Sequence, residues 1–471
     1  MTGLLLGGGV YLVALAKWPA AIAICLLAVA SWRRLGSRAL LLAGIVVLTA
    51  VWIDRSEPAP VAERSSESIS WHLVVQSMPQ QRSNGWDFTA EVLDGENDGL
   101  SLLVHSTDPT APSIGSRVYL RGEIEPREET TSSFDYLTGL GVSGEMYTSE
   151  VIIESAGSGL MAWLNERRFR VVRLIQDTVP GDSGSLLAGF VTGDDGRLSN
   201  DAEDEFRNAG LSHLTAISGS NLAMLLTMVG VAGFASRTNR RAILVAGVVI
   251  LWGYALFVDL PPPTLRAALL ATLAAAGRWI GRPVDLVGLT LLASAIQIAL
   301  VPISAWSISF HLSVAASFGL AAGFSRYPFT EVRRGVGELL TATAYAQFAT
   351  LPLIVGIFGT APLFGLLANI AAAPFATFAF AVGIIGSLAG LVAPEVGTAM
   401  LIPAGWSSDV VLDIARLFGR PGAQIAIEPL NDALIIGGTL LVLLALLTIS
   451  GELRLIRRQF AANTEISPEN G

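Results

Sequence analysis

The stretch Gly210–Leu226, GLSHLTAISGSNLAMLL, carries the side chains of this chain that are best suited to chemistry. It places His213, Ser218 and Asn221 at the start of a segment that then becomes apolar. Inside a hydrocarbon layer water cannot hydrate such groups, so each of them needs a partner or a wet cavity. Polar groups at this position indicate either the wall of a transport path or an intramembrane active site.

An active site would need a base within hydrogen-bond reach of a nucleophile. His213 or Ser218 could work with Asp194 or Asp195, which lie on a loop upstream in the chain. Aspartates followed by glycine are common in turns, so a simple turn explains this pair without any chemistry. We therefore expect no enzyme activity, and an intramembrane hydrolase stays as an alternative.

Metal and cofactor sites leave characteristic spacings, and this chain lacks them. Its four histidines stand far apart with no HxH, HxxxH or HExxH pair, which argues against a zinc hydrolase. The single cysteine, Cys25, forms no disulfide framework and no thiolate site. Without a Walker motif, any ATP-driven force must come from a partner protein. We expect no metal and no cofactor.

The composition places the chain among multi-pass membrane proteins. Of its 471 residues 52% are hydrophobic and only 15% are charged, and the mean hydropathy is +0.57. Such an excess of apolar residues is typical of polytopic helical proteins. The 48 glycines suit close helix packing in lipid.

Residues 1–53 read as N-terminal transmembrane helices rather than as a cleavable signal peptide, because no charged region precedes the apolar run. Arg33, Arg34 and Arg38 separate two apolar segments. The positive-inside rule puts this loop in the cytoplasm, so the soluble segment that follows should lie outside the cytoplasmic membrane.

That segment, residues 54–159, predicts an extracytoplasmic all-β domain behind a linker. Alternating runs bounded by turn residues occur at Ile69–Gln76, Trp86–Leu93, Leu100–His105, Arg117–Ile124 and Gly144–Ile153. Five short strands fit a small barrel of the OB type, which often binds single-stranded nucleic acid. The segment has 18 Asp or Glu against 6 Arg, a balance of −12. A basic groove for phosphates is not visible, which favours a structural role for this domain over nucleic-acid binding.

Residues 160–180 predict a basic amphipathic helix that lies in the membrane interface and joins the β domain to the membrane core. Its charge comes from Arg167, Arg168, Arg170 and Arg173. Interfacial helices carry arginine for lipid headgroups, and contact with DNA phosphates is the alternative.

Residues 181–453 predict a helical membrane domain, and residues 454–471 a polar cytoplasmic tail. Candidate spans run over 213–235, 242–258, 264–280, 284–302, 305–324, 339–358, 362–393 and 432–450. All the arginine clusters between the spans lie on the cytoplasmic side of the membrane if 362–393 is broken near Pro374 into a re-entrant or two-pass hairpin. Residues 397–419 read as a surface helix. The expected fold is thus a polytopic α-helical membrane protein with a small extracytoplasmic OB-like β-barrel domain.

Several ordered sequence blocks resemble the ComEC family of competence proteins. The segment LLAGFVTGDDGRLS precedes GLSHLTAISGSN, on whose pattern His213, Ser218, Gly219 and Asn221 fall. Further blocks that match are Pro263-x-x-Arg266-Ala267, Gly281-Arg282-Pro283, AQFATLP at Ala346–Pro352 and ANIAAAP at Ala368–Pro374. The resemblance covers about Leu186 to Leu391.

The resemblance implies a function that composition cannot show. It implies a channel or translocase component that passes single-stranded DNA across the cytoplasmic membrane during natural transformation. Candidate residues of the transport path, all on or near the family motifs, are His213, Ser218, Gly219, Asn221, Arg266, Gln347 and Asn369. Asn221, Gln347 and Asn369 could line a common cavity, and Arg266 could attract phosphate or reach lipid headgroups.

The resemblance also implies partners for this chain, and other functions stay open as alternatives. Many family members carry a C-terminal metallo-β-lactamase-like domain, and its H-x-H-x-D-H ligand set is not found here. A nuclease would then be a separate protein. The other partners that we expect are membrane lipids, a DNA receptor, an ATP-driven motor and a second copy of this chain. Interhelical hydrogen bonding explains the polar residues without a path, and a transporter for a nucleotide or an envelope precursor is a further alternative.

Overall fold

The structure is a computed structural model, and it describes residues 53, 58, 65–82, 84–93, 97–127, 136–194, 196–215, 217, 219–237, 239–281, 286–325, 332–420, 422–428 and 432–450. The N-terminal helices expected over residues 1–53 and the tail expected over 454–471 lie outside these residues, apart from Ile53. So do Ser218 and Asp195.

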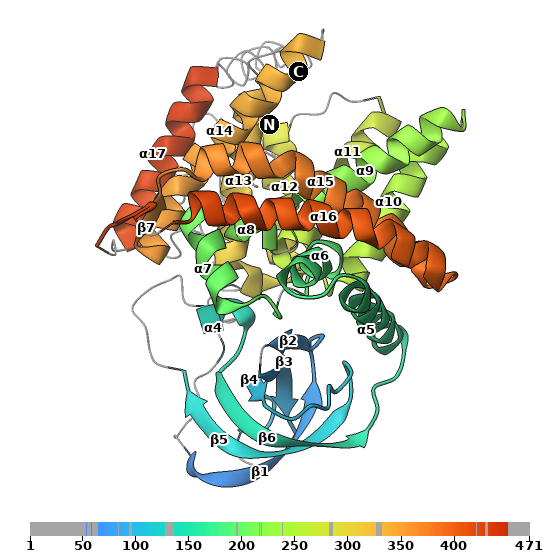
Figure 1. The fold of residues 1–471 in the computed structure, drawn as a ribbon. Helices are drawn as coiled ribbons and strands as arrows, with labels where there is room; N and C mark the ends of the chain where they lie inside the picture. The colour runs from blue at the N-terminus through green and yellow to red at the C-terminus, as the bar shows by residue number, and fades with distance from the viewer. Residues whose placement is uncertain are drawn as a thin grey trace, which may run out of the picture.

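The β domain is a closed barrel, at the bottom of Figure 1. Its strands are β1 (Ser65–Val75), β2 (Gln80–Arg82), β3 (Gly85–Val92), β4 (Ser101–Ser106), β5 (Arg117–Pro126) and β6 (Gly144–Ser155). The sheet order is β1-β5-β6-β4-β3-β2, and a pairing of β1 with β3 closes five strands into a barrel. Only the β4–β6 pair is parallel. The five predicted strands are confirmed, and the short β2 is additional.

Alternation of apolar and polar residues builds the inside of this barrel. Along β5, Val118, Leu120, Gly122 and Ile124 are buried, whereas the residues that alternate with them are partly or fully exposed. Leu73, Phe88 and the other inward residues complete one apolar core. The period-2 pattern in the sequence therefore fixes which face of each strand points inward.

Two helices connect the barrel to the helical domain. The helix α4 (Tyr136–Leu140) packs on the 3-10 helix η2 (Pro302–Trp306), and a Cβ at Gly139 would lie 3.1 Å from Ser307 Cα. The helix α5 (Leu160–Thr178) runs alongside the barrel, where Phe169 meets Trp86 edge-on with 5.4 Å between ring centroids. The predicted amphipathic helix is present. Of the four arginines that supply its predicted charge, Arg168 is buried.

The helical domain lies above the barrel in Figure 1. Its helices are α6 (Asp182–Thr192), α7 (Asn200–Ala209), α8 (Ser212–Thr215), α9 (Gly219–Ala235), α10 (Arg240–Phe257), α11 (Pro262–Trp279), α12 (Leu286–Leu300), α13 (Ile308–Ser325), α14 (Val332–Phe358), α15 (Gly365–Gly390), α16 (Pro394–Phe418) and α17 (Asp432–Ser450). The short strands β7 (Thr360–Pro362) and β8 (Gln424–Ala426) pair beside α14. Ser199 caps α7 by accepting a hydrogen bond from Ala202 N.

Helices α15 and α16 lie side by side and run across the view in Figure 1, whereas α17 runs roughly vertically. The prediction of a break near Pro374 is wrong, because α15 continues through this proline. Proline removes one helical hydrogen bond but is tolerated in helices that pack against neighbours, and α16 packs along α15. The two helices approach so closely that a Cβ at Gly397 would lie 2.3 Å from Gly390 Cα.

Three described helical segments are long and apolar enough to cross a membrane. They are Arg240–Phe257, Leu340–Phe358 and Gly365–Gly390, and shorter apolar helices include Asn221–Ala235, Leu286–Leu300 and Ile308–Gly323. Large apolar side chains such as Phe234 and Val249 are exposed on these helices. Helices that present apolar residues outward are typical of a membrane protein.

Candidate functional site

The family motifs converge at the end of α7. Gly210 caps α7 with a left-handed φ of +71°, and a Cβ there would lie 2.7 Å from Pro362 Cγ and 3.2 Å from Gly365 Cα. A side chain at this position would therefore be strained and would also clash. Glycine lets the GLSHL segment and the start of α15 approach each other.

This approach brings together three of the predicted path residues. The His213 imidazole pairs with the side chain of Asn369 on α15, and it remains accessible. Gln347 Nε2 on α14 lies 3.5 Å from the place where a Cβ of Gly365 would stand. We call Gly210, His213, Gln347, Gly365 and Asn369 the His213 cluster. It joins uncharged hydrogen-bonding groups from three separate blocks of the sequence.

Asn221 lies in the first turn of α9 and is buried. Its Nδ2 donates to the Phe190 carbonyl oxygen at 3.3 Å, and its side chain also pairs with the Tyr254 hydroxyl. The same hydroxyl donates to Val191 O at 3.2 Å. Asn221 therefore links α9 to α6 and to α10, the interhelical role that the sequence left open as an alternative.

The remaining path candidates fare differently. Gly219 begins α9, and a Cβ there would make only an ordinary contact of 3.7 Å with Ala267. Arg266 is 2% exposed, and its Nη1 donates to Phe310 O at 3.2 Å. Its guanidinium also lies over the Phe310 ring, 5.5 Å from the centroid. The expectation that Arg266 meets phosphate or lipid headgroups is corrected, because its side chain is enclosed between α11 and α13.

A buried ionic cluster at the junction of barrel and helices was missed by the sequence analysis. Arg168 is buried, its Nε donates to Thr192 O at 3.0 Å, and it lies near the Asp194 carboxylate. Burial raises the pKa of the Asp194 carboxyl, and Arg168 and Arg197 oppose this shift. The turn that contains Asp194 is therefore also an electrostatic contact between α5 and the loop after α6.

The same loop touches the barrel. A Cβ at Gly196 would lie only 1.9 Å from Gln81 O of β2, so glycine permits the contact. The sequence signal was the glycine after Asp194 and Asp195, but its contact with β2 depends on the tertiary structure.

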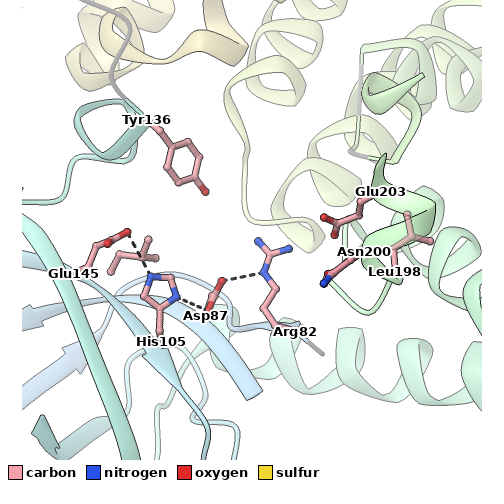
Figure 2. Close-up of a pocket in the computed structure, with 10 residues that line it drawn as sticks. Arg82, Asp87, His105, Tyr136, Glu145, Leu198, Asn200 and Glu203 are labelled. Atoms are coloured by element: carbon pink, nitrogen blue, oxygen red, sulfur yellow. Dashed lines mark hydrogen bonds and ion pairs between the residues drawn. The ribbon is translucent and has the colours of Figure 1, made fainter. Parts of the chain in front are cut away.

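Beside this contact lies a cavity of about 380 Å³ between the barrel and α7 (Figure 2). Carboxylates and an imidazole from neighbouring strands face it. His105 Nδ1 is 2.8 Å from Asp87 Oδ1, and His105 Nε2 is 3.5 Å from Glu145 Oε1. Arg82 Nε donates to Asp87 Oδ2 at 2.9 Å. Tyr136, Leu198, Asn200 and Glu203 also line the cavity. The sequence could not predict this group, because the register that sets Asp87 opposite His105 pairs separate strands.

The hydrogen bond to Asp87 raises the pKa of His105, although burial acts in the opposite direction. Burial acts to raise the pKa of Asp87, but the hydrogen bonds from His105 and Arg82 outweigh it, so the pKa of Asp87 is lowered. The contribution of His105 to stability is complete below the ordinary histidine pKa of about 6.5 and is lost as the pH rises through the higher pKa of the folded state. The contribution of Asp87 is lost at the acid end, as the pH falls through its lowered pKa.

We therefore expect β3 and β4 to lose protection against hydrogen exchange as the pH rises above about 6.5, through the raised pKa of His105, after correction for the intrinsic rate. His105→Gln should flatten this dependence. The control is His72→Gln, because His72 forms an exposed pair with Glu154 at 3.0 Å, and such pairs contribute little. An unchanged pH profile in His105→Gln would contradict the assignment.

No group of three or more His, Cys, Asp or Glu side chains that could hold a metal ion occurs in the part of the chain that the structure describes. The chemistry available at the His213 cluster is hydrogen bonding by neutral groups. At the cavity it is hydrogen bonding and charge pairing among Asp87, His105 and Glu145.

Comparison with known proteins gives the family of this chain. It is similar to ComE operon protein 3 of Bacillus subtilis (strain 168), with 23% identity over 207 residues, which are 44% of this chain and 26% of the relative. It is also similar to competence protein ComA of Neisseria gonorrhoeae, with 22% identity over 346 residues, 68% of this chain and 49% of the relative.

The chain thus spans about half or less of the length of these curated relatives. No solved structure matches it. The family model described as competence protein matches residues 190–452, which include the whole His213 cluster and more than half of the chain. The chain belongs to the competence protein family.

Proposed function

We propose that this chain is the membrane component that passes single-stranded DNA across the cytoplasmic membrane during DNA uptake. The observation that carries the proposal is the His213 cluster, where three separate motif blocks meet. His213, Gln347 and Asn369 offer hydrogen bonds and no fixed charge. A path for a polyanion needs polar walls that do not hold the phosphates tightly.

The entrance of such a path should carry positive potential. Arg170 and Arg173 on α5 are exposed, and Arg197 lies close enough to Arg173 for their charges to interact. The barrel segment is acidic, as its composition shows. We propose that the strand meets the protein along the exposed face of α5, and that the barrel, of the OB type, positions this helix. The orientation we propose places the barrel on the extracytoplasmic side.

The proposed role is transport rather than hydrolysis. In the described part of the chain the His213 imidazole pairs with Asn369 and with the backbone of Gly210. The Asp194 carboxylate has Arg168, Arg197 and Arg82 as its charged neighbours. A hydrolase would need one of these groups to act as a base on a nucleophile within hydrogen-bond reach.

The test is entry of labelled DNA into a nuclease-protected cytoplasmic pool, in strains with equal protein levels. We expect His213→Ala and Asn369→Ala each to lower entry about tenfold or more, since each removes one partner of the same hydrogen bond. The double variant should be no worse than either single variant. Asn208→Ala on α7 is the matched control, and DNA entry should be normal in this variant.

Normal DNA entry in a deletion strain would refute the DNA path. In that case uptake of labelled nucleotides or envelope precursors by the same variants tests the solute-transporter alternative. If DNA entry is normal in the two alanine variants but lost in the deletion strain, the proposed function stands. The His213 cluster is then not part of the DNA path.

A further inference from the structure

The turn between α10 and α11 has a strained backbone. Asp259 and Leu260 have φ values of +66° and +52°, and both carry side chains. Residues with a Cβ rarely adopt this left-handed conformation, because the Cβ comes too close to the following carbonyl oxygen. Three prolines, Pro261 to Pro263, follow directly. Such a conformation persists only where the surrounding structure holds it.

The barrel supplies one of the contacts that hold the turn. Asp259 Oδ2 accepts a hydrogen bond of 2.8 Å from Met78 N, in the loop between β1 and β2, although the two residues are 181 positions apart. Met78 is 3% exposed, so this bond is enclosed between the two domains. Within the turn, Leu260 N donates to Ala255 O at 2.9 Å.

The turn is also the point at which four helices of the membrane domain are joined. It ends α10 and begins α11, and Gln297 Nε2 on α12 donates to Pro262 O at 3.0 Å. One turn further along α11, Arg266 donates to Phe310 O on α13. Direct contacts therefore connect the start of α11, next to Asp259, to α12 and α13.

We propose that Asp259 is a positioning residue that couples the barrel to α11. Docking of the barrel holds the Asp259–Leu260 turn in its left-handed conformation, and this conformation sets the start of α11 and the place of the buried Arg266. When the barrel moves away, the turn relaxes and α11 loses its fixed start. The inference concerns only these two domains, so it can fail without affecting the proposed DNA path, and the reverse also holds.

The test is hydrogen–deuterium exchange of the full-length protein in detergent micelles, followed by mass spectrometry. Asp259→Ala removes the acceptor, so exchange at Met78 should become about ten- to hundredfold faster, as expected for a lost bond to a charged group. The peptide with Thr264 and Leu265, at the start of α11, should also exchange faster. Peptides of α16 should not change. Asp259→Asn is the conservative control, because asparagine keeps an acceptor and tolerates the left-handed region.

A second variant separates coupling from general damage. Leu260→Gly removes most of the strain, since glycine adopts positive φ without a steric cost. In Asp259→Ala/Leu260→Gly we expect hydrogen exchange at Met78 to remain fast, while the start of α11 regains the protection against exchange that it has in the wild type. The proposal is overturned if the exchange rate of α11 or of Met78 is unchanged in Asp259→Ala. It is also overturned if Leu260→Gly does not restore the protection of α11 in the double variant.

Discussion

Gly397→Ala should destabilise the helical domain by roughly 3 kcal/mol, because the new methyl group would meet backbone rather than a side chain. The Cβ would lie 2.3 Å from Gly390 Cα and 2.9 Å from Gly386 O. Neither atom can move without separating α15 from α16, the two helices that share the most extensive contact. Thermal unfolding of the full-length protein, followed by tryptophan fluorescence, measures the effect.

The matched control is Gly253→Ala on α10. No atom lies within 4 Å of a Cβ at Gly253. This substitution should stabilise its helix by up to about 1 kcal/mol, since alanine has a higher helix propensity than glycine. If the two variants unfold at the same temperature, the close packing of α15 on α16 is not a source of stability.

Arg168→Met should be the second strongly destabilising change, at about 3–5 kcal/mol, because it removes the positive charge that acts most strongly on the buried Asp194 carboxylate. It also leaves Thr192 O without its donor. Asp194→Asn in the same chain removes the uncompensated charge and should recover part of the loss. The free energies of unfolding of the wild type, the two single variants and the double variant give the coupling energy in a double-mutant cycle.

The control for this cycle is Arg170→Met on the same helix. Arg170 pairs with Glu166, and the two side chains are 51% and 58% exposed. Exposed pairs of this kind contribute at most about 1 kcal/mol, so this variant should unfold close to the wild type. Additive losses for Arg168→Met and Asp194→Asn would show that the two groups do not stabilise each other.

The sequence by itself determined the strands of the barrel and the apolar character of the helices. Alternation along a strand places residues such as Val118 and Leu120 on one face whatever the surroundings, because side chains in a strand point to opposite sides in turn. The motif blocks were equally visible, and they led to the correct family.

Only the tertiary structure decided which polar residues meet. His213 and Asn369 are 156 positions apart and become partners because glycines at positions 210 and 365 let two chain segments touch. Arg266 reads as an exposed charge in the sequence, but packing of α11 on α13 encloses it. The continuity of α15 through Pro374, where the sequence predicts a break, likewise became visible only in the folded chain, in which α16 packs along this helix. Long-range contacts of this kind depend on shape and on strand register, which local residue patterns do not specify.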